Sequence, residues 1–234
     1  MAKRPESGSG QVGGLGQSAR LAHIDGPAAF QRQFAVSRET LDRLSTYADL
    51  LKRWQSTINL VAPGTVGEVW HRHLADSAQV WAYRPADDAT WLDLGSGAGF
   101  PGLVLAILGA EGGQSRHILV ESDSRKAAFL REVARSTGVA VDIVCARIEN
   151  TKTIATVGTV QCVTARALAP LPRLLPLVAP YFASSTVGLF LKGREVASEL
   201  EEAARSWDFS AELKSSLTLT DSRIVLLSKL IRRP

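Results

Sequence analysis

The segment from residue 90 to residue 207 alternates short apolar runs with longer runs of helical periodicity. The expected strands are 90–94, 117–122, 141–147, 161–167 and 186–193, and the expected helices are 101–110, 124–138, 171–182 and 195–207. This alternation predicts an α/β fold with a doubly wound, mostly parallel sheet. Two further runs, 211–220 and 222–230, are too close together for a crossover helix. They predict a C-terminal antiparallel hairpin at or near one edge of the sheet.

Three regions are expected along the chain: a tail at 1–25, a helical N-terminal segment at 26–86, and the α/β domain at 87–234. The tail is rich in Gly, Ser and charge, a composition typical of disorder. Apolar residues recur at helical spacing after Ser37, which is a plausible N-cap. The T-x-x-E sequence at 65–68 has the pattern of a capping box and predicts the start of a second helix.

Composition limits the class of protein. The chain has 234 residues, 45% of them hydrophobic, and a formal net charge of +4. These values fit one soluble domain, or one domain with an appendage, and the small basic excess is compatible with an anionic partner. Cys145 and Cys162 lie in apolar runs, where core packing is expected rather than a disulfide or a metal site. We find no apolar run that predicts a membrane span and no secretory signal, so we expect a cytoplasmic protein, and a monomer.

The first expected strand runs into a loop with the sequence DLGSGAGFPG, residues 93–102. Its last three glycines satisfy G-x-G-x-x-G, which also occurs in dinucleotide-binding dehydrogenases. Asp93 extends the pattern to D-x-G-x-G-x-G, and an acid there suits a ligand with a cationic amino group. Glu121, at the end of the second strand, can accept the hydroxyls of a ribose. We therefore favour S-adenosylmethionine bound near Gly95 and Gly97, and an NAD(P)-dependent Rossmann-type dehydrogenase remains the alternative.

Segments beyond this loop carry a resemblance to a known family. The pieces LDLGSGAGFPGLVLAI, INLVA, RHLADS, ESDSRKAAFLREVAR, ARIEN, TARALAPL and FLKG resemble, in order and spacing, the RsmG family, also called GidB. The resemblance implies a class I methyltransferase fold and S-adenosyl-L-methionine as cofactor. It also implies methylation of N7 of one guanine in 16S rRNA, the family's guanosine-527 site, with the small ribosomal subunit as substrate.

The same resemblance implies positions for several site residues. Gly95 and Phe100 would contact the cofactor from the loop, and Ile148 and Glu149 would flank its adenine. Arg166 would lie beside the cofactor at the end of the fourth strand. Relatives often have an Asp two places after Glu121, so Glu121 and Asp123 are both candidates for the ribose. We prefer Glu121, because Asp123 can instead start the next helix.

The chemistry of a guanine N7 agrees with the residues present. N7 has a lone pair and no proton, so its methylation requires alignment and exclusion of water but no general base. The N-P-P-Y signature of amine methylation is absent after the fourth strand, and Cys162 is expected in the core rather than as a nucleophile. Arg166 could hold the methionine carboxylate or an RNA phosphate.

Candidate RNA contacts are Lys192, Arg147 and Arg125, although solvated side chains would explain the first two equally well. His71 and His73 do not share a helical face, and no metal site is expected. A non-catalytic RNA-binding module that keeps this fold is a third possibility.

Overall fold

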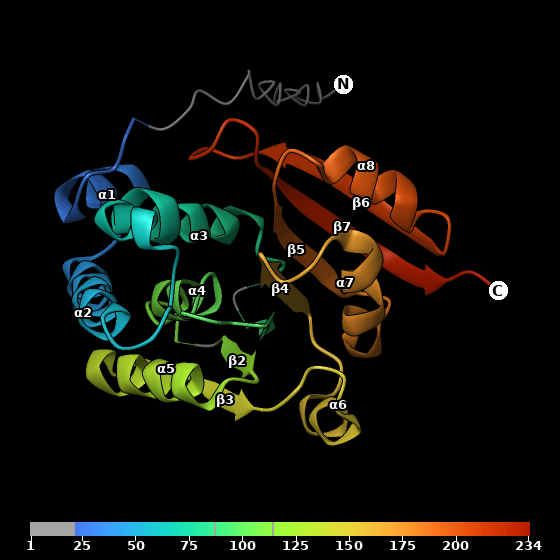
Figure 1. Cartoon of the computed structure of the whole chain (residues 1–234), viewed down its shortest axis with the longest axis horizontal. Coiled ribbons are helices and arrows are strands. Elements are labelled where there is room, and N and C mark those ends of the chain that lie inside the picture. The colour runs from blue at the N-terminus through green and yellow to red at the C-terminus, as the bar shows by residue number, and fades with distance from the viewer. Residues whose placement is uncertain (1–21, 87, 114) are drawn as a thin grey trace, which may run out of the picture.

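The computed structural model describes residues 22–86, 88–113 and 115–234, so most of the expected tail lies outside the described residues. Its centre is one seven-stranded sheet (Figure 1). The strand order is β3 (Asp142–Cys145), β2 (Arg116–Glu121), β1 (Thr90–Leu94), β4 (Cys162–Arg166), β5 (Val187–Lys192), β7 (Arg223–Arg232) and β6 (Trp207–Ser215). The first five are parallel to one another. Strand β7 is antiparallel to β5, and β6 is antiparallel to β7. This confirms the doubly wound sheet with a closing hairpin.

Helices cover both faces of the sheet. One face packs against α4 (Gly102–Gly109) and α5 (Ser124–Thr137), and the other against α6 (Thr151–Val157), α7 (Leu171–Val178) and α8 (Val196–Ala203). Strand β1 pairs with β2 on one side and β4 on the other. The crossovers therefore change direction between β1 and β4, and the carboxyl ends of these strands form the crevice where such sheets bind ligands.

The N-terminal segment continues the core on the α4–α5 face. It contains α1 (Pro27–Phe34), α2 (Arg38–Gln55), a 3-10 turn at Pro63–Glu68, a π-helical turn at Val69–Ala75, α3 (Asp76–Ala78) and a 3-10 turn at Gln79–Tyr83. Apolar residues of α1, α2, α4 and α5 belong to one buried cluster. Packing of the N-terminal helices against the helices of the sheet therefore stabilises both regions together.

Local signals at the helix starts had mixed outcomes. Ser37 is the N-cap of α2, as expected, and its hydroxyl accepts a hydrogen bond from the Thr40 amide at 3.1 Å. The capping box expected at 65–68 is wrong. The helical turn begins earlier, at Pro63, and the Thr65 hydroxyl donates to the Ala62 carbonyl at 2.7 Å instead of capping a helix.

Three further expectations differ from the structure. The sequence did not indicate α1 or α6, and α6 has only seven residues. The helix expected at 195–207 ends at Ala203, because Trp207 starts β6 and packs into the sheet core. Cys162 is buried as expected, but Cys145 is exposed at the end of the edge strand β3.

Candidate functional site

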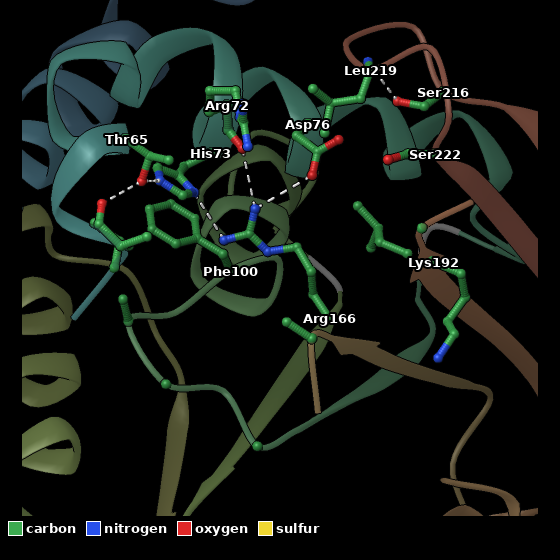
Figure 2. A pocket seen from close by; sticks show the side chains of 18 of the residues that line it. Thr65, Arg72, His73, Asp76, Phe100, Arg166, Lys192, Ser216, Leu219 and Ser222 are labelled. Carbon is green, nitrogen blue, oxygen red and sulfur yellow. Dashed lines mark hydrogen bonds and ion pairs between the residues drawn. The ribbon is translucent and has the colours of Figure 1, made fainter. Parts of the chain in front are cut away.

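Two clefts adjoin at the carboxyl ends of the central strands. The β2–β3 cleft, of about 430 Å³, is lined by residues that include Glu121, Ile148 and Glu149. The β4–β5 cleft, of about 510 Å³, lies between the sheet and the N-terminal segment. Its lining residues are drawn in Figure 2. Gly95, Gly97, Lys126 and Ala167 line both clefts, so a single extended ligand can reach from one to the other across the glycine loop.

The glycine loop has a backbone that only glycine adopts easily. Gly95 has φ +66°, and a Cβ at this position would lie 2.7 Å from Leu168 Cδ1. Gly97 also has positive φ, and its amide donates to Glu121 Oε2 at 2.8 Å. A side chain at Gly95 would therefore strain the loop and fill the boundary between the two clefts.

Glu121 and Asp123 take different roles. Glu121 lines the β2–β3 cleft, and its second carboxylate oxygen accepts from the Asp123 amide at 2.7 Å. Asp123 is the N-cap of α5 and accepts from the amides of Arg125 and Lys126. Glu121 lines the cleft, whereas Asp123 caps the helix and does not line it, and a carboxylate oxygen can accept more than one hydrogen bond. The contact of Glu121 with the ribose stays a prediction.

The segment after β3 forms the opposite wall of the same cleft. Ile148 and Glu149 line it, together with Arg147. Ile148 is fixed by the Tyr181 hydroxyl, which donates to its carbonyl at 2.8 Å. Ile148 and Glu149 thus line the same cleft as Glu121, and their contact with the adenine stays a prediction. Arg147 is exposed at the rim, where an anionic partner can reach it.

Asp93 does not line either cleft. Its side chain is buried, with the residue only 3% exposed, and Oδ1 accepts from the Thr164 hydroxyl at 2.7 Å. A Cβ on Gly102, at the start of α4, would lie 2.7 Å from Oδ2. Burial raises the pKa of Asp93 to about 6. The carboxylate thus lies beneath the loop, so direct contact with a ligand amino group, as expected from sequence, is not what this geometry shows.

Phe100 lies in an aromatic stack beside the glycine loop. It is 4% exposed, with Tyr47 stacked at 5.2 Å and His73 stacked at 5.0 Å between ring centroids. The Arg166 guanidinium lies 4.9 Å from the same centroid. The Phe100 ring therefore packs against Arg166 and His73 at the β4–β5 cleft, which Phe100 also lines. Its contact with the cofactor stays a prediction.

Arg166 ends β4 and points into the β4–β5 cleft (Figure 2). Nη1 lies 3.2 Å from the Arg72 carbonyl and 3.3 Å from Asp76 Oδ2, and Nη2 lies 3.0 Å from His73 Nδ1. These three partners all belong to the N-terminal segment. The helical N-terminal segment thus builds one wall of the site.

Lys192 is not available to an RNA phosphate in this structure. Its side chain is only 9% exposed, and Nζ lies 2.6 Å from Glu199 Oε2 and donates to the Ala169 carbonyl at 2.8 Å. The same Glu199 oxygen accepts from the Leu171 amide. Both sequence interpretations of Lys192, a phosphate contact and a solvated lysine, are therefore replaced by a buried ion pair that ties β5 to α7 and α8.

The remaining candidates lie at the surface. Arg125 is exposed beside its ion-pair partner Asp123, at 3.5 Å, and lines a shallow hollow between α2 and α5. Within residues 22–86, 88–113 and 115–234, no group of three or more metal-ligating side chains occurs. None of the helices in this described part is both long and apolar enough to span a membrane.

Sequence reasoning missed four residues of the site. Tyr47 donates to the Ala98 carbonyl and so anchors the glycine loop, and Lys126 lines both clefts. His73 and Asp76 contact Arg166. Three of the four lie in segments that carry the family resemblance, His73 and Asp76 in RHLADS and Lys126 in ESDSRKAAFLREVAR, but the resemblance assigned them no roles.

Comparison with known proteins agrees with this geometry. The family model GidB, described as rRNA small subunit methyltransferase G, matches residues 40–225. A curated "Ribosomal RNA small subunit methyltransferase G" of Methylorubrum extorquens strain PA1 is 49% identical over 84% of this chain and 92% of its own length. The protein of the same name from Parvibaculum lavamentivorans is 52% identical over 77% of this chain and 79% of its own.

The fold also matches a solved structure described as a TehB-like SAM-dependent methyltransferase from Corynebacterium glutamicum. The TM-score is 0.53 at 13% sequence identity, covering 80% of this chain and 99% of that one. The seven-stranded sheet is that of a class I methyltransferase. With the family model spanning most of the chain and relatives about 50% identical, this chain belongs to the rRNA small subunit methyltransferase G family.

Proposed function

We propose that this protein transfers the methyl group of S-adenosylmethionine to N7 of one guanine in 16S rRNA within the small ribosomal subunit. The observation that carries the proposal is the pair of adjoining clefts that share the glycine loop, one lined by Glu121 and the other by Arg166. The family shown by the comparisons supplies the substrate class, small-subunit rRNA. The site supplies the arguments for the cofactor and for the kind of acceptor atom.

The chemistry of the lining residues fits S-adenosylmethionine. Glu121 can accept the ribose hydroxyls, and Ile148 offers an apolar wall for the adenine beside Glu149. Gly95 lets the backbone approach the ligand closely between the two clefts. The methionine end then lies toward Arg166, and the bound cofactor supplies an electrophilic methyl group. The protein's part is to align this group with the acceptor and to exclude water.

Among the described residues that line the β4–β5 cleft, the His and Asp side chains are already hydrogen-bonded. His73, the nearest candidate for a general base, has Nδ1 against Arg166 and Nε2 2.8 Å from the Thr65 hydroxyl. Burial, with the Arg166 and Arg72 charges, lowers the pKa of His73 to about 3. Asp76 is bonded to Arg166 and Thr218. Such a site suits an acceptor that already has a lone pair and no proton to lose, as guanine N7 does.

Exposed arginines beside the site are candidates for RNA contact. Arg147 lies at the β2–β3 cleft and Arg125 at the neighbouring hollow at the start of α5, where contacts to phosphates would give salt-dependent binding. The guanine must be accessible or rotated out of its stack to reach the cleft. We further propose that the protein acts on ribosomal subunits in the cytoplasm as a monomer.

Chain cleavage at N7-methylguanine tests this function in cells. Ribosomal RNA from a strain lacking the gene is treated with borohydride and aniline, and the cleavage sites are mapped by primer extension. One cleavage site in 16S rRNA should disappear in that strain and return when the wild-type gene is restored. Retention of every site in the deletion strain contradicts the proposal.

A variant of the glycine loop separates the enzyme from a non-catalytic RNA-binding module. Gly95→Asp introduces a side chain and a negative charge at the boundary of the two clefts. For an enzyme, complementation with this variant leaves the 16S site unmethylated. If the variant instead restores all function of the wild-type gene, the protein acts by binding RNA alone.

A further inference from the structure

The hydrogen bonds that the described residues make to the Arg166 guanidinium all lie along its outer edge. Its hydrogen bonds to the Arg72 carbonyl, Asp76 and His73 use both Nη1 protons and one Nη2 proton. Figure 2 shows these partners gathered around the outer end of the side chain. Arg72, His73 and Asp76 all come from one helical stretch, residues 69–78, and they fix the orientation of a residue about ninety positions away.

Two donors of Arg166 remain without a partner among the described residues: Nε–H and the second Nη2–H. In a planar guanidinium these two protons lie on the same edge and point the same way. The Arg166 side chain is 18% exposed and lines the β4–β5 cleft. The free edge is therefore a two-pronged donor offered to a ligand in that cleft.

The geometry of this edge favours a carboxylate over the acceptor base. An arginine fork pairs with two oxygens of a carboxylate, and it also pairs with O6 and N7 of a guanine. A hydrogen bond donated to N7 would occupy the lone pair that must attack the methyl group. The fork is thus compatible with the reaction when it binds the amino-acid carboxylate of the cofactor, and it inhibits the reaction when it binds the guanine edge.

We propose that His73 and Asp76 are positioning residues: they fix the outer edge of Arg166 so that its free edge binds the methionine carboxylate of S-adenosylmethionine. This inference rests on the proposed function for the identity of the ligand. The two residues act through Arg166 and contact no reacting atom.

His73 is suited to this role because it stays neutral. Its Nδ1 accepts from Arg166, which requires the proton on Nε2, beside the Thr65 hydroxyl at 2.8 Å. A protonated imidazole could not accept and would repel the guanidinium. The surrounding charges agree, since Arg166 and Arg72 both lower the pKa of His73.

Asp76 connects the arginine to the C-terminal hairpin. Its Oδ2 faces Arg166, while Oδ1 accepts from the Thr218 hydroxyl at 2.7 Å and from Gln79 Nε2 at 2.9 Å. Asp76 is buried, so its charge is balanced mainly by Arg166. Replacing it with Asn would place either an uncharged acceptor or an amide donor against the arginine and loosen its orientation.

Binding of two ligands tests the inference with full-length protein. S-adenosylhomocysteine carries the carboxylate, and 5′-methylthioadenosine lacks the whole amino-acid part. By calorimetry, His73→Leu and Asp76→Asn should lower the affinity for S-adenosylhomocysteine roughly tenfold or more, as expected for loss of a charge-assisted hydrogen bond. The same variants should change the affinity for 5′-methylthioadenosine less than about threefold. Arg166→Lys, which loses the planar fork, should give the same selective loss.

Conservative and remote variants provide the controls. His73→Asn keeps an acceptor near the position of Nδ1 and should recover most of the affinity for S-adenosylhomocysteine. His117→Leu makes the same substitution at another buried histidine, at the amino end of β2, and should leave both affinities unchanged. If the His73 and Asp76 variants lose affinity for both ligands equally, the proposal is overturned. It is also overturned if those variants bind S-adenosylhomocysteine as tightly as wild type while Arg166→Lys binds it more weakly.

Failure of this inference is distinguishable from failure of the proposed function. If wild-type protein methylates guanine N7 in small subunits but the variants bind S-adenosylhomocysteine normally, only the positioning role is wrong. If the selective loss is found but the wild type modifies another nucleoside, only the proposed acceptor is wrong.

Discussion

Asp93 illustrates how the environment of a single residue decides its chemistry. Its position in the loop pattern suggests contact with a ligand, yet its carboxylate is buried beneath the loop between Thr164 and Gly102. Burial raises the pKa of this carboxyl group from 3.8 to about 6, although the Thr164 hydroxyl and the Arg166 charge partly oppose the shift. The motif thus identified an important position, but the direction of the side chain depends on packing that the motif does not encode.

Asp93 should make the folded state less stable as the pH rises. Its folded pKa, about 6, lies above the unfolded value, so the folded state holds its proton more tightly between pH 4 and 6. The free energy of unfolding therefore loses up to about 2–3 kcal/mol across this window and stays lowered above it. Denaturant unfolding of Asp93→Asn should show the variant gaining stability relative to wild type from pH 4.5 to pH 8. An unchanged difference between the two proteins would contradict this account.

Gly95 and Gly138 form a matched pair for testing the glycine loop. Both have φ +66°, but a Cβ on Gly95 meets Leu168 while one on Gly138 meets nothing within 4 Å. Each Ala substitution costs about 1 kcal/mol of backbone strain. Of the two variants, Gly95→Ala alone should also lower the affinity for S-adenosylhomocysteine, roughly tenfold or more, as measured by calorimetry. Equal binding by the two variants would show that close approach at Gly95 is not required.

The ends of the elements are tied by the ion pair between Lys192 at the end of β5 and Glu199 in α8. Glu199 also accepts from the Leu171 amide at the start of α7, so one carboxylate joins three elements at the rim of the clefts. Lys192 resembles a surface residue in the sequence because it follows an apolar strand and precedes a glycine. Its burial results from the positions of α7 and α8, which no local pattern specifies.

Removal of this buried cation should destabilise the fold. Lys192→Met leaves Glu199 without its partner, and we expect a loss of about 3 kcal/mol in the free energy of unfolding. Lys214→Met, which breaks the more exposed pair with Glu212 on β6, should cost less than about 1 kcal/mol. Urea denaturation of both variants measures the difference. If Lys192→Met lowers the free energy of unfolding no more than Lys214→Met does and mainly weakens RNA binding, Lys192 contacts a phosphate instead.

The sequence predicted the regular elements better than their ends. The bounds of β1, α4 and α5 were predicted closely. α5 is amphipathic and has an N-cap at Asp123 and a glycine at its end, whereas α4 is a short, wholly buried apolar run directly after the glycine loop. The sequence did not indicate the short helices α1 and α6. The stretch 63–83 alternates 3-10, π and α turns, since Thr65, His73 and Asp76 form tertiary contacts there that override the local capping pattern.

The whole molecule behaves as one packed unit across the expected boundary at residue 86. The buried cluster on the α4–α5 face includes Leu44 and Leu51 of α2 together with Leu103 and Phe129. The site also spans the boundary, since His73 and Asp76 hold Arg166. The family resemblance implied cofactor contacts at Gly95, Ile148 and Arg166, and the end of the second expected strand pointed to Glu121. The structure places all four at the two clefts. Contacts over about ninety residues, as at His73, require the fold itself.

Unfolding should therefore be a single cooperative transition. Trp54 and Trp70 report on the N-terminal segment, whereas Trp91 and Trp207 lie in the sheet. Variants that retain tryptophan in only one of these regions should give the same urea midpoint by fluorescence, equal to the midpoint by far-UV circular dichroism. An earlier transition of Trp54 and Trp70 would show that the N-terminal segment is a separate, less stable domain.

Nucleoside analysis after methyl transfer tests the central claim most directly. Purified protein is incubated with labelled S-adenosylmethionine and small ribosomal subunits from a strain that lacks the gene, with naked 16S rRNA and the Gly95→Asp variant in parallel. The account predicts label in 7-methylguanosine alone, close to one per 16S rRNA in the subunits, and none with the variant. Label in any other nucleoside, or no transfer to either RNA substrate by the wild-type protein, would contradict it.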